Sequence, residues 1–421
     1  MPPAATDPEL LARSAQRIGA DVERLGVPPY TTGERGITRH AYTPEYAATV
    51  GFFAGALGEL GFDVHFDPVG TLVARNVPRG RPALGIGSHC DANRGGGKWD
   101  GTLGCVVALE VCRLAAERGL RLPLQVLAFL EEEGSGFGQM LLGSRIMAGR
   151  IEQAELDALA GEDGTPFLDA ARAAGYPADR WRDSGQELDG LAAWLEVHIE
   201  QGRVLQDTAT QLGVVDRIAG YVHADLSVAG RADHAGATPM GFRSDAGLTA
   251  AEITLELERL TVAAAPDAVG TVGALALAPG LINVIPERAD LTVDARSASG
   301  AHVAVFEQLV AFARERAASR GQEVTVRERA RVEPQPLSTD VADLAEQVAG
   351  EVGASVRRMA SGAVHDTQLV AAAGVPSAML FVPCRDGISH SPAEHAEPAD
   401  AALAAHVCLG VLERLAAAPP A

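Results

Sequence analysis

The sequence predicts an α/β protein built from two folded parts, and two patterns support this. Continuous apolar runs such as 124–130 and 377–382 alternate with helical stretches, as expected for a sheet that helices cover on both faces. Between about residues 216 and 332, the strands instead alternate apolar and polar residues, which indicates a sheet with one buried face. A chain of 421 residues has room for two or three domains.

The elements are expected in the following order. In the first part we expect a helix over 8–25 and a second helix over 43–60, which Thr43 caps and Gly61 ends. These are followed by strands over 62–66, 71–76 and 83–87, a helix over 103–116, and strands over 124–130 and 192–199. The middle part predicts strands over 221–228, 269–277 and 289–295 and helices over 245–260 and 302–319. A helix over 341–352, a strand over 377–382 and a helix over 399–415 follow. We therefore expect one mixed-sheet domain from residues 1–216 and 332–421, split by an inserted two-layer α+β domain of residues 217–331.

Composition excludes several functions. The chain has 35 Lys and Arg against 55 Asp and Glu, a net charge of −20, which argues against a broad basic surface for nucleic acid. No apolar run approaches the roughly 18 residues of a membrane span. The five cysteines are scattered and lack CxxC spacing, which predicts reduced thiols. The N-terminus, MPPAATDPEL, has no basic segment before an apolar core, so we expect no secretory signal and a cytoplasmic protein.

Polar clusters follow the predicted strands, where open α/β sheets place their sites. In GSHCDANRGGGKWDG, His89 and Asp91 lie one residue apart, so that Asp91 can orient the imidazole of a metal-binding His89. The glycine run 95–97 allows a tight fold that brings Asp100 towards His89. The alternative is a flexible turn before a helix that starts at Asp100.

Further clusters have the same character. Glu131, Glu132 and Glu133 follow a buried strand, where one glutamate can bind a metal while its neighbour acts as general base; the alternative is a solvated loop. His198 in LEVHIEQG is either a ligand or a satisfied core histidine. The remaining histidines of interest are His234 in DHAGATPM, His365 in SGAVHD and His390 in GISHSPAEH. Taken together, histidines beside Gly, Ser and acidic residues favour a metal site.

These motifs carry a family resemblance. The motifs follow one another along the chain from about residue 30 to 410, in the order GSHCD to KWDG, EEEGS, GSR, HIEQG, HAGATPM, NVIP, DAR, SGAVHD and GISHSPAE. In this order they resemble the amidase branch of the aminoacylase/carboxypeptidase superfamily of dinuclear metallohydrolases. That branch includes N-carbamoyl-L-amino acid hydrolases, β-ureidopropionases and allantoate amidohydrolases.

The resemblance implies a metal centre and a base. Asp100 would bridge two divalent cations per subunit, Zn²⁺ or Mn²⁺, with Co²⁺ or Ni²⁺ also compatible. One cation would take His89 and His198, and the other Glu133 and His390. Glu132 would be the general base for water attack on an amide or ureido carbonyl.

The resemblance also implies residues for substrate. His234, from the inserted domain of the same or a partner subunit, would donate a hydrogen bond to the tetrahedral intermediate. Arg296 would bind a substrate carboxylate, for which the alternative is an ordinary surface arginine. Asn283, Gln201 and His365 would line the same pocket. The inserted domain would act as a lid and form a homodimer.

The expected activity is hydrolysis of a linear C–N bond in a small N-carbamoyl amino acid. Alternatives are an allantoate- or ureidoglycolate-type ureide, an N-acyl amino acid or dipeptide, and a non-catalytic small-molecule binder, against which the retained Glu132 argues. Three departures from the branch lie near the site: Gly136 in place of arginine, Val364 in place of glycine, and the loop 90–95. They bear on substrate identity, because none removes an expected ligand or the base.

Overall fold

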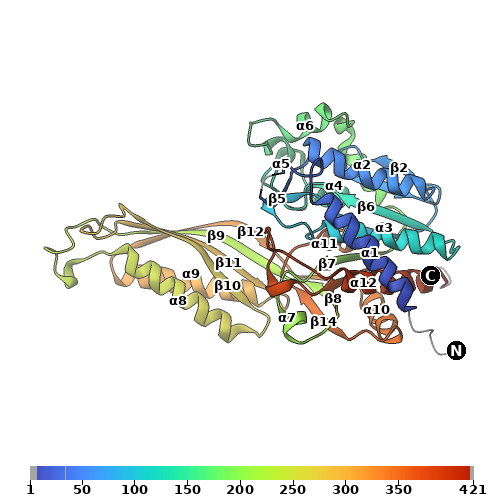
Figure 1. Ribbon diagram of the computed structural model, residues 1–421. Helices are drawn as coiled ribbons and strands as arrows, with labels where there is room; N and C mark the ends of the chain where they lie inside the picture. Colours follow the sequence, from blue (N-terminus) through green and yellow to red (C-terminus); the bar gives the residue numbers. More distant parts are fainter. Residues whose placement is uncertain (1–6, 34, 418–421) are drawn as a thin grey trace. The chain divides into compact units, whose positions relative to one another are not determined.

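The computed structural model describes residues 7–33 and 35–417, which form two compact units (Figure 1). The first unit runs to Asp216 and continues through Pro336–Met359 and from His365 onward. The second consists of Arg217–Gln335 and Ala360–Val364. Residues 1–6, part of the segment considered for a secretory signal, lie outside the described ranges. Within those ranges, no helix combines the length and apolarity needed to cross a membrane.

A nine-stranded mixed sheet is the centre of the first unit. Its order is β13 (Gln335–Pro336), β8 (Leu212–Ile218), β15 (Ser377–Val382), β7 (Leu191–Ile199), β4 (Ala83–His89), β6 (Leu124–Phe129), β3 (Leu72–Arg75) and β2 (Asp63–Phe66), and β14 (Val356–Ser361) pairs with β8. The neighbours β15, β7, β4 and β6 run parallel to one another. Antiparallel strands flank this parallel block on both sides.

Helices cover both faces of this sheet. Alternate residues of β6 enter different cores: Val126 belongs to the large cluster that includes α1 (Pro8–Leu25), α3 (Thr102–Glu117) and α12 (Pro398–Ala417). Its neighbour Leu127 belongs to a second cluster with residues of α4 (Leu142–Met147) and α11 (Asp366–Ala372). Because adjacent strand residues point to opposite faces, each face has its own apolar layer. The predicted α/β sheet with two covered faces is confirmed.

The helices predicted from the sequence are all present, whereas the shorter helical segments between them were not predicted. The first helix has the predicted bounds, and α2 (Pro44–Glu59) starts at Thr43, whose hydroxyl accepts the Tyr46 N–H at 3.3 Å. The other helical segments of the first unit are α5 (Gln153–Ala158), α6 (Phe167–Ala173), η1 (Ala178–Glu187), α7 (Val204–Asp207), α10 (Thr339–Glu351) and η3 (Arg385–Gly387). All five cysteines are buried, unpaired thiols.

The second unit has two layers. Its antiparallel sheet has the order β10 (Val269–Ala278), β11 (Arg288–Ser297), β9 (Gly220–Ala229) and β12 (Glu323–Val332). The helices α8 (Ala246–Ala264) and α9 (Ala301–Ser319) share one apolar core with the sheet, and η2 (Met240–Phe242) lies in a loop. Buried and part-exposed residues alternate along β9 and β11, so the helices cover one face.

The sequence missed several strands. The segment 323–332 is β12, although charged residues dominate it. Part of the glycine run expected to form a turn belongs to β5 (Ala92–Gly96), which pairs with β1 (Ile37–Arg39). The strands β1 and β5 are too short to show a period, and in β12 Glu328 interrupts the alternation of apolar residues.

Candidate metal centre and active site

The expected chemical groups gather at the carboxyl ends of the four parallel strands. His89 is the last residue of β4, and His198 lies near the end of β7. Glu132 and Glu133 lie in the loop that follows β6, and His390 lies in the loop after β15. Because the carboxyl ends of neighbouring parallel strands meet at one edge of the sheet, segments distant in sequence supply one site.

Asp100 reaches this edge from the loop between β5 and α3. The next residue, Gly101, has φ of +60°, and a Cβ there would lie only 2.1 Å from the imidazole of His89. The chain at this position therefore requires glycine, both for its left-handed backbone and for its close approach to the ring. Asp100 itself is 3% exposed.

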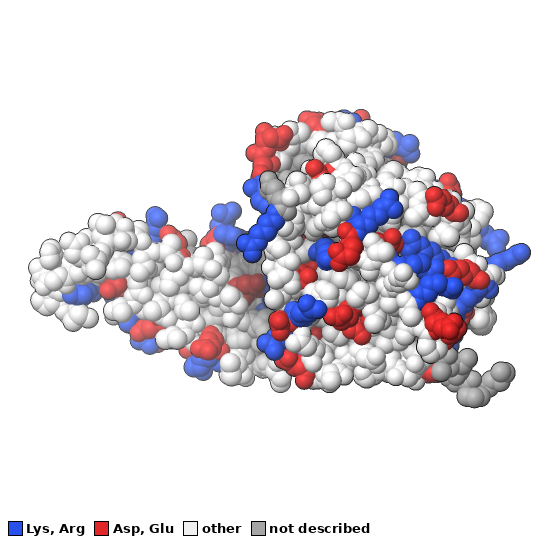
Figure 2. All heavy atoms as spheres, viewed as in Figure 1, with Lys and Arg blue, Asp and Glu red and all other residues white. Residues whose placement is uncertain are grey.

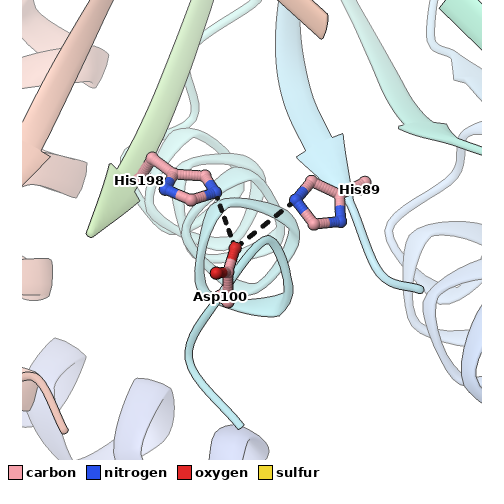
Figure 3. A group of neighbouring side chains, drawn as sticks. All are labelled: His89, Asp100 and His198. Carbon is pink, nitrogen blue, oxygen red and sulfur yellow. Dashed lines mark ion pairs between the residues drawn. The ribbon is translucent and has the colours of Figure 1, made fainter. Parts of the chain in front are cut away.

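The possible metal ligands form two groups that share the carboxylate of Asp100, and these are called the two donor groups below. Oδ1 of Asp100 lies 3.1 Å from Nε2 of His198 and 3.6 Å from Nε2 of His89, with both rings facing that oxygen (Figure 3). Its Oδ2 lies 3.3 Å from Nε2 of His390, which is also 3.3 Å from Oε2 of Glu133. In each group, one possible ligand atom from every residue lies within 4.8 Å of the others, close enough for the three to bind one cation. Each group combines imidazole nitrogen with carboxylate oxygen, which suits a divalent cation such as Zn²⁺ or Mn²⁺.

Hydrogen bonds orient the two buried imidazoles. Nδ1 of His198 lies 3.0 Å from the carbonyl oxygen of Ile199, and its Nε2 accepts the N–H of Gly101 at 3.2 Å. In a neutral ring this pattern places the proton on Nδ1, so that the unprotonated nitrogen is Nε2, the atom that lies near Asp100. Nδ1 of His89 lies 3.4 Å from Oδ1 of Asp91 and 3.3 Å from the Asp91 carbonyl oxygen.

The electrostatics of the site fit bound cations. Burial and the nearby Asp100 carboxylate raise the pKa of Glu133 to about 7, and burial raises the pKa of Glu132 well above its ordinary value. Burial also opposes ionisation of Asp100, but the adjacent histidines, His198 first, hold its pKa well below the usual range. Several buried carboxylates packed together favour protonation unless positive charge is added. Divalent cations in the two groups would supply that charge.

Asp91 fixes the loop that carries Glu132. Its Oδ1 accepts the N–H of Glu132 at 3.1 Å, and its Oδ2 accepts the N–H of Glu133 at 3.0 Å. Oε2 of Glu132 lies 3.6 Å from Nε2 of His89, outside both donor groups. Glu132 is therefore close to the donors but remains available to exchange a proton.

The other expected residues divide between the units. Nε2 of Gln201 donates to Oδ2 of Asp100 at 2.7 Å, and the ring of His365 lies against His198 with centroids 4.6 Å apart. His234, Asn283 and Arg296 belong to the second unit.

Two of these second-unit residues have defined local geometry. Nδ1 of His234 accepts the N–H groups of Gly236 and Ala237, both at 3.1 Å, so a neutral ring carries its proton on the exposed side at Nε2. Arg296 donates from Nε and Nη2 to Asp294 and from Nη1 to the carbonyl oxygen of Gly362. Each side chain thus presents oriented hydrogen-bond donors.

Sequence reasoning missed two contributors to the site. Ser389 donates to Oδ2 of Asp100 at 2.8 Å, and the buried Glu394 accepts the backbone N–H of Asp100 at 2.9 Å. Both lie in the GISHSPAEH segment, where an acidic residue four positions after His390 was the available signal.

Arginines and acidic residues are interspersed on the face shown in Figure 2. The single lysine, Lys98, bonds at the surface to Glu23, although it lies only two residues before Asp100.

Comparison with known proteins agrees with this geometry. Residues 87–414 match the model of peptidase family M20/M25/M40. The chain belongs to this family. The match includes every residue of both donor groups, the whole second unit and the first unit from residue 87 to residue 414. The family resemblance inferred from the motifs is confirmed, and the chain is an M20-family hydrolase.

Several relatives of the chain are named as amidohydrolases. The chain is 35% identical to an N-carbamoyl-L-amino-acid amidohydrolase of Paenarthrobacter aurescens, over 95% of this chain and 98% of that protein. It is 34% identical to a ureidoglycolate hydrolase of Arabidopsis thaliana, over 87% and 79%. Among solved structures, it resembles an amidase of the hydantoinase/carbamoylase family from Burkholderia multivorans, with a TM-score of 0.86, 29% identity and coverage of 98% and 99%. The motif-based expectation of an enzyme acting on non-peptide C–N bonds is borne out.

Proposed function

We propose that this M20-family hydrolase cleaves the linear C–N bond of a small N-carbamoyl amino acid at a centre of two divalent cations. The observation that carries the proposal is the division of donors by Asp100, with Glu132 held beside them. Asp100, His89 and His198 would hold one cation, and Asp100, Glu133 and His390 the other. When bound, such cations supply Lewis acidity, lowering the pKa of water and stabilising negative charge on the carbonyl oxygen.

The chain's own residues supply the proton transfer. Glu132 accepts a proton from the water whose oxygen forms the new bond to the ureido carbonyl carbon. It then donates that proton to the leaving nitrogen as the C–N bond breaks, so the carboxylate is regenerated. The Nε2–H of His234 is the group proposed to donate to the oxygen that becomes negative. Asp91 keeps Glu132 in register through the backbone bond described above.

Arg296 is proposed to bind the substrate carboxylate. Asp294 and Gly362 engage three of its five N–H groups, leaving one on Nη1 and one on Nη2 for a carboxylate in bidentate geometry. The guanidinium also lies 5.7 Å from the ring centroid of Tyr221. The bonds to Asp294 and Gly362 therefore fix the orientation of the guanidinium, and its two remaining N–H groups can bind the carboxylate.

Replacing Arg296 with alanine should reduce kcat/KM for an N-carbamoyl amino acid roughly 100-fold or more, since a charge-assisted bidentate pair is lost. Arg296→Lys should keep only part of the parent's kcat/KM, because an ammonium group cannot form a bidentate pair with a carboxylate. The control is a substrate whose carboxylate is a carboxamide: the parent and Arg296→Ala should hydrolyse it at similar rates. A change within a few-fold on the carboxylated substrate would leave Arg296 an ordinary surface residue.

Substrate identity is tested by a panel. Purified enzyme reconstituted with Mn²⁺ or Zn²⁺ is offered N-carbamoyl amino acids, allantoate, ureidoglycolate, an N-acetyl amino acid and a dipeptide. Ammonia release scores the ureido substrates, and amine release scores the last two. We expect the highest kcat/KM with N-carbamoyl amino acids. Preference for allantoate or ureidoglycolate would instead support a ureide hydrolase, the activity named for the Arabidopsis relative.

The second unit is proposed to form a homodimer. On α8, Leu248, Leu255 and Val262 recur every seven residues on one exposed face, and the last two are 66% and 80% exposed. The sheet edge formed by β10 has no charged residue, whereas the opposite edge strand β12 carries several. An uncharged edge beside an apolar helix face suits pairing with a second copy about a two-fold axis.

Leu255→Glu should weaken this dimer at least about tenfold, because a carboxylate would become buried at the interface. Sedimentation equilibrium at micromolar concentrations measures the change. Val27→Glu, which alters an exposed valine of the first unit, should leave association unchanged. A parent protein that is monomeric at these concentrations would exclude the dimer.

A further inference from the structure

One buried carboxylate connects the loops that carry Asp100 and His390. Oε1 of Glu394 accepts the N–H groups of Trp99 at 2.8 Å and Asp100 at 2.9 Å. Its Oε2 accepts the N–H of His390 at 3.3 Å and also lies 3.3 Å from Oγ of Ser389, the hydroxyl that donates to Asp100. Glu394 is 3% exposed, so water does not compete for these bonds.

The glycine run before Asp100 makes room for this carboxylate. A Cβ on residue 97 would lie 2.2 Å from the carboxyl carbon of Glu394. Any residue other than glycine at this position would therefore clash with Glu394. Gly97 is thus needed for the approach of Glu394 rather than for flexibility alone.

His390 depends on this contact more than the other donors do. Its φ is +53°, a left-handed conformation that is strained for a residue other than glycine. Its side chain is 51% exposed, whereas those of His89 and His198 are each 1% exposed. Packing therefore restrains the His390 ring weakly, and the backbone bond to Glu394 restrains the residue that carries it.

We propose that Glu394 is a positioning residue that holds His390 and Asp100 at the spacing a cation requires, and so sets the affinity of the group Asp100, Glu133 and His390. Glu394 belongs to neither donor group, so it acts through the residues it holds. The group containing His89 and His198 depends on it less, because the strands β4 and β7 fix both rings. This inference rests on the proposed metal centre.

The test is a titration of the metal-free full-length protein with Mn²⁺, by isothermal calorimetry and by equilibrium dialysis with elemental analysis. The parent should bind two ions. In Glu394→Ala, the affinity for one of the two should fall about 10- to 100-fold, the range found when groups supporting metal ligands are lost. In Glu394→Gln, the amide oxygen can accept from Trp99 and Asp100, but the amide nitrogen faces the N–H of His390. The loss should therefore be intermediate.

Two further variants separate positioning from general stability. Gly97→Ala displaces Glu394 without removing its carboxylate and should cause a similar selective loss. Asp67→Ala removes a fully buried carboxylate that accepts three N–H groups of its own loop. It should lower the melting temperature yet leave both Mn²⁺ affinities unchanged.

The outcomes distinguish the inference from the proposal beneath it. If the parent binds two ions and Glu394→Ala, Glu394→Gln and Gly97→Ala bind both with the parent's affinities, the positioning role is wrong and the metal centre stands. If Glu394→Ala weakened Mn²⁺ binding equally at both sites and Asp67→Ala did so too, the positioning role would also be wrong, because the effect would then reflect a loss of general stability. A parent that binds no Mn²⁺ would remove the metal centre itself.

Discussion

Glu132→Gln is expected to reduce kcat about 10²- to 10⁴-fold, the contribution typical of a general base, while the enzyme keeps its full metal content. Glutamine has the shape of glutamate but cannot take a proton from water at neutral pH. Glu132 lies outside both donor groups, and its loop is fixed by backbone bonds to Asp91 that the substitution leaves in place. Steady-state kinetics and elemental analysis of the same preparation measure the two effects.

Glu131→Gln is the matched control, one residue earlier in the same loop. Oε1 of Glu131 accepts the N–H groups of Gly136 and Phe137, and an amide oxygen can do the same. Its activity should stay within a few-fold of the parent. If Glu132→Gln were equally active, the proton acceptor would be another group. If it lost its metal, Glu132 would be a ligand rather than the base.

The sequence predicted those parts of the site that depend on strand ends. His89 and His198 lie at the ends of buried strands and Glu133 in the loop after another, and the apolar runs of these strands are visible in the sequence. Parallel order then brings them to one edge, as the α/β class requires. The assignment of each residue to a particular cation came from family resemblance, because sequence spacing alone cannot pair residues more than 100 positions apart. It remains a proposal that metal binding must test.

Contacts between distant loops could not be predicted in this way. Glu394 bonds to the backbone of Asp100 across 294 positions, and nothing in the local pattern of SPAEH specifies that partner. The same holds for the ring of His365 against His198, which links the loop before α11 to β7. The run of glycines was visible, but its reason, the space taken by the Glu394 carboxyl group, exists only in the folded chain.

Asp100→Ala is expected to abolish binding at both sites together, with affinity for Mn²⁺ reduced more than about 100-fold, because the two groups share this residue. Hydrolysis should fall to background. His198→Ala and His390→Ala are the comparison, since each removes a donor from one group only, and each should lose one ion of the two.

Thermal unfolding provides a second measurement that does not require turnover. A ligand present at 100 times its Kd stabilises the fold by about 2.7 kcal/mol, so Mn²⁺ should raise the melting temperature of the parent. Asp100→Ala should show no such rise, and the two histidine variants should show a smaller one. If Asp100→Ala lost only one ion, the carboxylate would serve a single site, and the opposed contacts of Oδ1 and Oδ2 would have to be explained by hydrogen bonding to the histidines alone.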